Sequence, residues 1–459
     1  MRLKLTFPDN CRAERKWIAD VLLRHFLGIS VEVVFAATPK VVISAGNRKL
    51  ELPDLFFQSA ATQWLGAFDY PPPILPSWNV AASGLRAELV ERDAPVLFGK
   101  GSFTLDESGN GALGLDIFGA AFFMLSRYEE AVSLERDGHG RFPASASVAF
   151  RCGFLHRPLA DEYVEILWAA MSKIWPALKR KSRQFRTVVS CDVDHPYHPG
   201  VGSLARTAKR VVGELVRTND LSRAATALKN YGALRTGNWD HDPYYYTVDW
   251  MMDVNERAGN RVSFYFIPEI TDPRHDDTCP LTDKAVLAMM ARISARGHEI
   301  GLHPGYNTYE SRARIASAKR RLQSVLDRAQ LGQKVIGGRH HYLRWSTRTP
   351  AIWDAAGLEY DSTLSYAEHA GFRCGTCHEY PMFDLHRRVP LQVRQRPLVC
   401  MEASVLRYMG YGVGEQALAK MMKLKAAAVR MRGNFTLLWH NSAFDSAAAR
   451  DMYCQIIRN

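Results

Sequence analysis

The sequence predicts an α/β protein with two domains, a smaller mixed α/β domain over residues 1–180 and a larger (β/α) barrel over residues 186–459. Helix-like and strand-like segments alternate from residue 242 onward, which is typical of parallel strands joined by helices. The length of this alternating region suits a barrel. The stretch at residues 187–196 opens the region. It begins as an apolar, β-branched run and ends in acidic residues, a histidine and a proline, which predicts a buried parallel strand whose carboxyl end lies at a site.

In the first domain, helices are predicted from the helical spacing of apolar residues, and strands are predicted from short apolar runs. The predicted helices cover residues 11–26, 117–128 and 158–178, and the predicted strands cover residues 30–35 and 40–44. Asp116 precedes the second helix and is a suitable N-cap. No residues in this domain have the spacing of a catalytic constellation, so we expect an accessory or scaffold domain.

The basic stretch Lys179-Arg-Lys-Ser-Arg183 is the predicted boundary between the domains. Beyond it, strands are predicted within residues 187–196 and at 261–267, 297–303, 334–337, 398–403 and 435–439, and helices at 247–258, 282–296 and 311–329. Residues 200–242 are rich in arginine and lysine and predict a basic helical insertion. A solvated helical surface is the favoured interpretation of this insertion, and a basic lid over a negatively charged substrate is the alternative.

The net charge of +12 indicates anionic partners, such as an acidic glycan or a lipid surface. No nucleic acid is expected as a partner, because the aromatic residues are not interleaved with the basic ones in a recognisable nucleic-acid motif. No apolar stretch approaches the roughly 18 residues of a membrane helix, and the first residues do not resemble a signal peptide. We therefore expect a cytoplasmic protein, with peripheral binding at the inner membrane face as a further expectation.

The eight cysteines are scattered along the chain, which favours a reducing compartment over a disulfide framework. The segment Cys374-Gly-Thr-Cys377 has the spacing of a metal or redox motif. Because the sequence contains no second such pair, we interpret this segment as a turn that carries two thiols.

Polar side chains follow five of the predicted strands at the point where each strand ends. Because the carboxyl ends of parallel strands meet at one edge of a sheet, we expect these side chains to lie close together. The two acids of the first strand also point to the same side of it. The residues are Asp192, Asp194, His303, Arg339, Glu402 and His440.

These residue types suit hydrolysis by an activated water. His303 and Asp194 offer an imidazole and a carboxylate to a Zn²⁺-type ion, with positions left open for water. Such an ion lowers the pKa of its bound water to about 7. Asp192 can accept the proton of the water, Arg339 can orient and acidify Asp192, and His440 can protonate the leaving group.

Four segments resemble the ordered motifs of the NodB-type polysaccharide deacetylases, carbohydrate esterase family 4. They are Cys191-Asp-Val-Asp-His195, Gly297-His-Glu-Ile-Gly-Leu-His303, Arg339-His-His-Tyr342 and Leu438-Trp-His440. The resemblance covers about residues 186–445 and implies a deformed (β/α) barrel that hydrolyses acetyl groups on sugars. It also implies that Asp192 is the base, Asp194 and His303 bind the metal, Arg339 tunes the base, and His440 is the acid. The first 180 residues resemble an uncharacterised domain that precedes some of these deacetylases.

Some positions depart from the pattern of the family. Asn307 stands where a second metal-binding histidine is expected, so three arrangements are open: Asn307 binds the metal, His195 takes its place, or no metal is tightly bound. His341 stands where the family usually has proline, and it is either an added ligand or a substrate contact. For the carboxylate that tunes the catalytic histidine we expect Glu402, with a structural salt bridge as the alternative. The oxyanion donor is expected to be a backbone N–H near Tyr342.

The predicted function is a hydrolase that removes an N-acetyl or related acyl group from a sugar in a glycan or glycolipid precursor. Its expected cofactor is a divalent metal, Zn²⁺ in the first place, and its expected substrate is an anionic or lipid-linked glycan. The alternatives are a metal-independent hydrolase of small amides and a non-catalytic glycan-binding protein. The presence of Asp192, Arg339 and His440 together disfavours the last alternative, because binding alone needs neither a base nor an acid.

Overall fold

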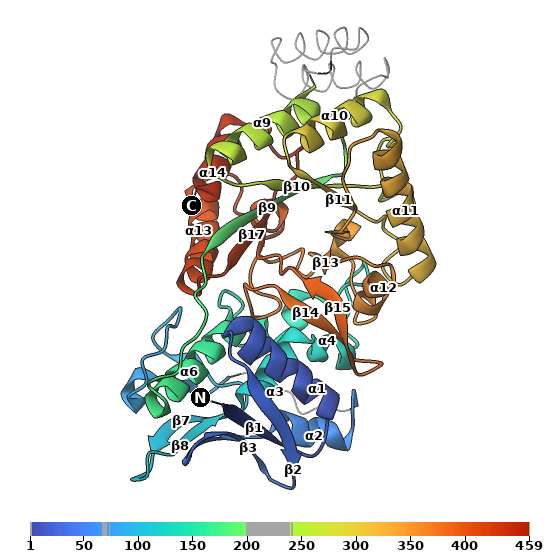
Figure 1. Cartoon of the computed structure of the whole chain (residues 1–459). Coiled ribbons are helices and arrows are strands. Elements are labelled where there is room, and N and C mark those ends of the chain that lie inside the picture. Colours follow the sequence, from blue (N-terminus) through green and yellow to red (C-terminus); the bar gives the residue numbers. More distant parts are fainter. Residues whose placement is uncertain (1, 67–70, 73, 199–238, 240–241, 459) are drawn as a thin grey trace. The chain divides into compact units, whose positions relative to one another are not determined.

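The computed structural model of the chain describes residues 2–66, 71–72, 74–198, 239 and 242–458 (Figure 1). Unit 1 comprises Met1–Arg186, Tyr342–Tyr411 and Ala419–Thr436. Unit 2 comprises Thr187–His341, Gly412–Leu418 and Leu437–Asn459. The predicted basic insertion at residues 200–242 lies outside the described residues, apart from Trp239 and Asp242.

This division differs from the predicted pair of domains. The first break falls after Arg186, but residues 342–411 and 419–436 belong to unit 1 rather than to the C-terminal region. Contacts over long sequence distances account for this difference. The Trp17 indole N–H, for example, donates a hydrogen bond of 3.0 Å to the carbonyl of Pro381. Residues 342–411 and 419–436, which lie within the region predicted as a barrel, therefore contribute to the core of unit 1.

A mixed six-stranded sheet forms the base of unit 1, in the order β2-β1-β3-β4-β8-β7 (Figure 1). The strands are β1 (Leu3–Pro8), β2 (Val31–Ala36), β3 (Lys40–Ala45), β4 (Arg48–Pro53), β7 (Gly99–Leu105) and β8 (Gly111–Leu115). Strand β1 pairs in parallel with β2 and antiparallel with β3. Leu3, Leu5 and Phe7 alternate along β1 and are buried, so one face of this strand packs into the core.

Helices and smaller strands complete unit 1. The helices are α1 (Arg12–Ala19), α2 (Phe56–Thr62), α3 (Ile117–Leu125), α4 (Tyr128–Val132), α5 (Val148–Arg151), α6 (Leu159–Ile174) and α12 (Thr349–Ala355). The further strands are β5 (Ser77–Trp78), β6 (Ala94–Pro95), β13 (Tyr360–Asp361), β14 (Tyr380–Asp384), β15 (Val389–Gln395) and β16 (Cys400–Met401). The predicted cap of α3 is confirmed, because the Asp116 carboxylate accepts a hydrogen bond of 2.8 Å from the backbone N–H of Gly119.

Unit 2 is built around five neighbouring strands in the order β12-β11-β10-β9-β17. The strands are β9 (Arg186–Val193), β10 (Val262–Phe266), β11 (Glu299–Leu302), β12 (Gly337–Gly338) and β17 (Asn434–Leu438), of which β9 begins and β17 ends across a unit break. The pairs β9–β10, β10–β11 and β11–β12 are parallel. All five residues of β10 are buried, as expected for the centre of a parallel sheet that is covered on both faces.

The helices of unit 2 alternate with its strands as the sequence predicts (Figure 1). They are α9 (Pro243–Arg257), α10 (Lys284–Ala295), α11 (Arg312–Arg328) and α14 (Ala447–Ile457), and α13 (Glu415–Arg430) spans a unit break. Asp242, Asp283 and Ser311 cap α9, α10 and α11 through their side-chain oxygens. These caps satisfy N–H groups that would otherwise lack partners at the start of each helix.

The mixed α/β class is confirmed, whereas a closed barrel does not form among the described strands. The sheet that contains the five strands of unit 2 does not close on itself, because the strands at its two ends are not paired with each other. In the part of the chain that the structure describes, no helix combines the length and apolar character needed to cross a membrane.

A buried ion-pair network joins two distant segments of unit 1. The Glu130 carboxylate accepts hydrogen bonds of 2.8 Å from Arg127 and of 2.7 and 2.9 Å from Arg373. Burial acts to raise the pKa of Glu130, but the charges of Arg373 and Arg127 outweigh it and hold the pKa below its ordinary value. The carboxylate is therefore ionised at neutral pH and contributes to the stability of unit 1.

We predict that Glu130→Gln lowers the free energy of unfolding by about 3–5 kcal/mol at pH 7, because it leaves the buried guanidinium group of Arg373 without its counter-charge. The pKa of Glu130 is lowered in the folded protein, so the stabilisation is present above the ordinary value of 4.5 and is lost as the pH falls through the folded value. The difference between wild type and variant should therefore shrink in acid. Urea unfolding, followed by circular dichroism at several pH values, measures this difference in the free energy of unfolding.

The matched control is Asp9→Asn, which removes the acid of the exposed Asp9–Arg12 pair. Exposed pairs contribute little, so this change should leave the free energy of unfolding nearly unchanged. Equal losses for the two variants, or a loss at Glu130 that does not depend on pH, would contradict the role assigned to the network.

Candidate metal centre

The ends of three parallel strands in unit 2 bring polar side chains to one edge of the sheet. Asp192 lies in β9 in register with Tyr265 of β10, next to the strand end. His303 directly follows β11, and Arg339 directly follows β12. Because neighbouring parallel strands end side by side, these three residues meet although they lie far apart in sequence.

A buried ion pair joins the first and third of these strand ends. Arg339 Nη1 donates a hydrogen bond of 2.7 Å to Asp192 Oδ1, and both side chains are buried. The guanidinium group also lies over the Tyr265 ring, 5.1 Å from its centroid. The other carboxylate oxygen, Asp192 Oδ2, lies 3.7 Å from His303 Nε2. Arg339 therefore fixes one oxygen of Asp192, and the second faces His303.

Asp194, His303 and His341 form a compact group of potential metal ligands, with one ligand atom from each residue within 4.8 Å of the others. Asp194 Oδ1 lies 3.1 Å from His303 Nε2 and 3.8 Å from His341 Nε2. This oxygen is buried and has no hydrogen-bond partner among the described residues. Burial acts to raise the pKa of Asp194, but the charges of His341 and His440 and its interactions with His303 outweigh it and hold the pKa well below its ordinary value.

The remaining ring nitrogens of both histidines are already engaged. His303 Nδ1 lies 2.6 Å from the backbone carbonyl oxygen of Arg339. His341 Nδ1 lies 2.7 Å from Asp276 Oδ1. In each case Nδ1 can carry the proton and donate it, so that Nε2, which lies near Asp194, can serve as the ligand atom. Metal-binding histidines typically have such a carbonyl or carboxylate partner on the second nitrogen.

These three residues fit a divalent metal. Two neutral imidazoles and one carboxylate, with further positions open, are the donor set of many catalytic zinc sites and suit other first-row divalent ions. The buried Asp194 oxygen without a hydrogen bond is the observation that supports the fit, because such an atom is costly unless it has a partner.

His440 lies close to the second carboxylate oxygen of Asp194. Its Nε2 is 3.7 Å from Asp194 Oδ2, and its side chain is 18% exposed. His440 follows β17, whose neighbour β9 provides Asp194. The structure thus brings together Asp192, Asp194, His303, Arg339 and His440 from four strand ends.

The candidate ligand group contains His341 beside Asp194 and His303, and among the described residues His195 does not belong to it. The Asn307 side chain is exposed and its amide nitrogen lies 3.3 Å from the carbonyl oxygen of Thr271. The backbone carbonyl of His195 accepts a hydrogen bond from Asn441, but its ring is not part of the ligand group. Of the two roles predicted for His341, the geometry therefore favours that of an added ligand.

Two predicted site residues, Tyr342 and Glu402, belong to unit 1, whereas the ligand group lies in unit 2. Tyr342 has a left-handed backbone conformation with φ of 60°, and its carbonyl accepts a hydrogen bond of 2.8 Å from Arg141. Glu402 is buried. Their roles as oxyanion donor and tuning carboxylate stay predictions.

Asp276 is a member of this site that the sequence motifs do not identify. Besides His341, its carboxylate accepts hydrogen bonds from the backbone N–H groups of Tyr306 and Thr271. Burial acts to raise the pKa of Asp276, but these hydrogen bonds outweigh it and hold the pKa well below its ordinary value. Asp276 lies in the loop between β10 and α10, and the only signal for it is an acid that follows a strand end at some distance.

Comparison with known proteins gives one match to a family of unknown function, DUF7033, over residues 3–176. This match covers the N-terminal part of unit 1 and well under half of the chain. No curated protein gives a significant sequence match.

Three solved structures are similar to parts of the chain. A protein assigned as a polysaccharide deacetylase from Mycobacterium smegmatis is 13% identical, with a TM-score of 0.38, and the match covers 60% of this chain and 84% of that one. A mutant of a carbohydrate esterase family 4 pseudoenzyme with restored activity is 10% identical, with a TM-score of 0.28 and coverages of 46% and 56%. A protein assigned as a polysaccharide deacetylase of O-antigen biosynthesis from Bordetella bronchiseptica is 14% identical, with a TM-score of 0.26 and coverages of 47% and 75%.

We predict that Asp276→Asn weakens Zn²⁺ binding about 10- to 100-fold, because His341 loses the carboxylate that orients its ring and raises its basicity. Competition with a chromophoric chelator measures the affinity of the purified protein. The matched control is Asp277→Asn, one residue away, where the side chain is exposed. Unchanged affinity in the Asp276 variant, or an equal loss in the control, would show that His341 is not held for a metal.

Proposed function

We propose that this chain is a metal-dependent hydrolase that removes an N-acetyl or related acyl group from a sugar. The observation that carries the proposal is the buried Asp192–Arg339 pair, which lies beside the ligand group of Asp194 and His303. A base, its orienting cation and a candidate metal site within a few ångströms are the parts needed to activate a water. The resemblance of the strand-end motifs to the NodB-type deacetylases supports the same reaction.

Asp194, His303 and His341 would hold the metal, which supplies Lewis acidity that polarises an acyl oxygen and lowers the pKa of water. Zn²⁺ is the proposed ion, because it favours imidazole and carboxylate donors with an open coordination position.

Asp192 is the proposed base. Its Oδ1 is held by Arg339, so Oδ2 is the oxygen that takes the proton from the attacking water. The water oxygen bonds to the acyl carbon as the proton moves to Asp192.

His440 is the proposed acid. When the carbon–nitrogen bond breaks, the departing amine needs a proton, and His440 supplies it from the far side of the Asp194 carboxylate. The products are a free amine on the sugar and the carboxylic acid of the acyl group. The partly exposed position of His440 allows it to regain its proton from solvent.

The proposed substrate is a glycan or glycolipid precursor that carries negative charge or a lipid carrier. The net charge of +12 supports an anionic partner. A cytoplasmic location, with peripheral binding to the inner membrane face, is part of this proposal.

We predict that Asp192→Asn lowers kcat for acetate release by at least about a thousandfold, because the amide cannot accept the proton. His440→Gln should also lower kcat, while both variants retain bound metal. Acetate release from a panel of N-acetylated sugars, beside elemental analysis, provides the measurement. Asp451→Asn, an exposed acid of α14, is the control. Wild-type turnover in the Asp192 variant would end its assignment as the base.

Metal removal gives a separate prediction. Treatment with a strong chelator should abolish acetate release, and Zn²⁺ added back should restore it, because the proposed reaction needs a polarised acyl group. Elemental analysis before and after treatment verifies that the metal has been removed. Turnover that survives full removal would instead support a metal-independent amide hydrolase.

A further inference from the structure

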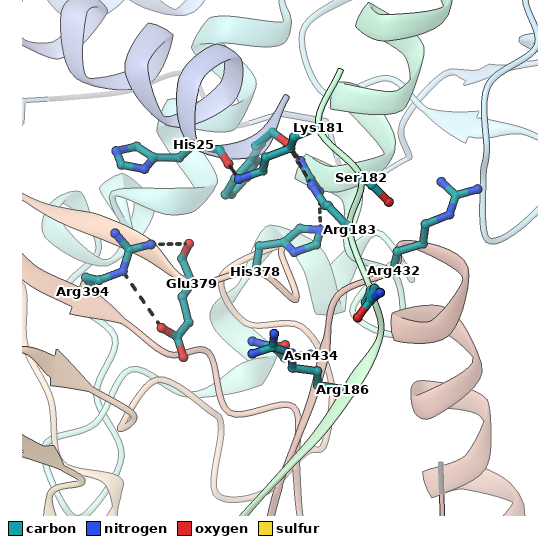
Figure 2. Close-up of a pocket in the computed structure, with 12 residues that line it drawn as sticks. His25, Lys181, Ser182, Arg183, Arg186, His378, Glu379, Arg394, Arg432 and Asn434 are labelled. Carbon is teal, nitrogen blue, oxygen red and sulfur yellow. Dashed lines mark hydrogen bonds and ion pairs between the residues drawn. The ribbon is translucent and has the colours of Figure 1, made fainter. Parts of the chain in front are cut away.

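Unit 1 contains a pocket of about 370 Å³ that the proposed function does not use (Figure 2). Its wall includes part of the basic stretch that precedes β9, the segment around β14 and β15, and the connection from α13 to β17. Five of the side chains that line it are cationic: Lys181, Arg183, Arg186, Arg394 and Arg432. No residue of the candidate metal centre is among the lining residues.

The acid among the lining residues is already neutralised. Glu379 accepts a hydrogen bond of 2.6 Å from Arg396. Its carboxylate also lies 4.0 Å from Arg394 (Figure 2). Among the described residues, no carboxylate lies within ion-pair distance of the four other cationic side chains, Lys181, Arg183, Arg186 and Arg432. The pocket therefore carries an excess of positive charge that the protein does not balance.

The cationic groups are held in place although they repel one another. Arg183 donates hydrogen bonds to the carbonyl of Phe26, lies over the Phe26 ring, and also contacts His378 Nε2. The ammonium group of Lys181 donates to the carbonyl of His25. Burial and the charges of Arg183 and Arg394 lower the pKa of Lys181 below its ordinary value. An anion in the pocket would relieve this repulsion.

A metal is the alternative occupant, because Asp161, Cys377 and His378 form a ligand-like group at the edge of the pocket. Three contacts argue against it. Asp161 already accepts hydrogen bonds from Thr376 and Cys377, and the guanidinium group of Arg183 contacts His378. Burial and the neighbouring Asp161 hold the pKa of the Cys377 thiol well above its ordinary value, so it is not a thiolate. The local chemistry favours an anion over a cation.

We propose that this pocket binds the phosphate or diphosphate group of a small ligand. Guanidinium groups recognise phosphate oxygens through paired hydrogen bonds, and a lysine adds a point charge. A carboxylate would bring one charge and two acceptor atoms, whereas four unpaired cations match a group with several charges and several acceptors. The volume lies within the range of small-ligand pockets, so part of the ligand beyond the phosphate can also enter.

Arg186 and Arg432 are the residues to change, since both side chains are exposed and their loss leaves the core intact. Calorimetric titration of the full chain with sodium pyrophosphate, at fixed ionic strength and pH, should give saturable binding. The double variant R186Q/R432Q should bind at least about tenfold more weakly, because each arginine contributes a charge-assisted hydrogen bond. Circular dichroism and the Tm of the variant verify that the fold is retained.

The matched control is R320Q/R328Q, which removes the same charge from the exposed face of α11 in unit 2. It should bind pyrophosphate as the wild type does. Vesicles that contain phosphatidic acid are tested beside free pyrophosphate and tell whether a lipid or a soluble molecule carries the phosphate. Whichever of the two probes binds the wild type should bind R186Q/R432Q at least about tenfold more weakly. No binding by the wild type to either probe, or equal effects of the two double variants, would overturn the proposal.

Discussion

The ion pair between Asp192 and Arg339 is the interaction on which the candidate site depends. Two fully buried charges are tolerated only when each has a close partner, and here the partners come from the ends of two different strands. The pair therefore requires β9 and β12 to end at the same edge of the sheet. Any displacement of these strands would leave a buried charge uncompensated, which links the register of the sheet to the geometry of the site.

The same edge of the sheet sets the direction of the two histidines. His303 uses the carbonyl of Arg339 as the partner of its Nδ1, so the residue that holds the base also orients a candidate ligand. His341 uses Asp276, whose other contacts tie it to the backbone of two loops. Both rings thus present Nε2 to Asp194. Contacts outside the candidate ligand group therefore set the orientation of both rings, as is typical of metal-binding histidines.

Much of the fold of unit 2 could be predicted from the sequence, because its signals are local. Residues 261–267 form a largely apolar run that Pro268 ends, and residues 297–303 lie between a helical pattern and a polar loop, so β10 and β11 fall within the predicted ranges. The hairpin of β14 and β15 was not predicted. Pro381 and Pro390 interrupt the two strands, and proline within a run argues against a strand. The membership of this hairpin in unit 1 depends on contacts with residues such as Trp17, which no local pattern reveals.

The candidate site was predictable to the extent that it is built from strand ends. Asp192, Asp194, His303, Arg339 and His440 all stand at such ends and meet as expected. Spacing did not predict that His341 belongs to the candidate ligand group. The motif of the family predicts a ligand at residue 307, whereas His341 approaches Asp194 from another segment. Asp276 was missed for the same reason, because a loop acid has no fixed spacing from the motifs that it supports.

The most direct test of the central claim is anomalous X-ray diffraction at the zinc edge from crystals of the full chain grown with Zn²⁺. The account predicts an anomalous peak about 2.0–2.2 Å from Asp194 and from Nε2 of His303 and His341, the distances typical of zinc ligands. A peak bound by Asn307 or His195 instead of His341, or no peak near Asp194, would contradict it.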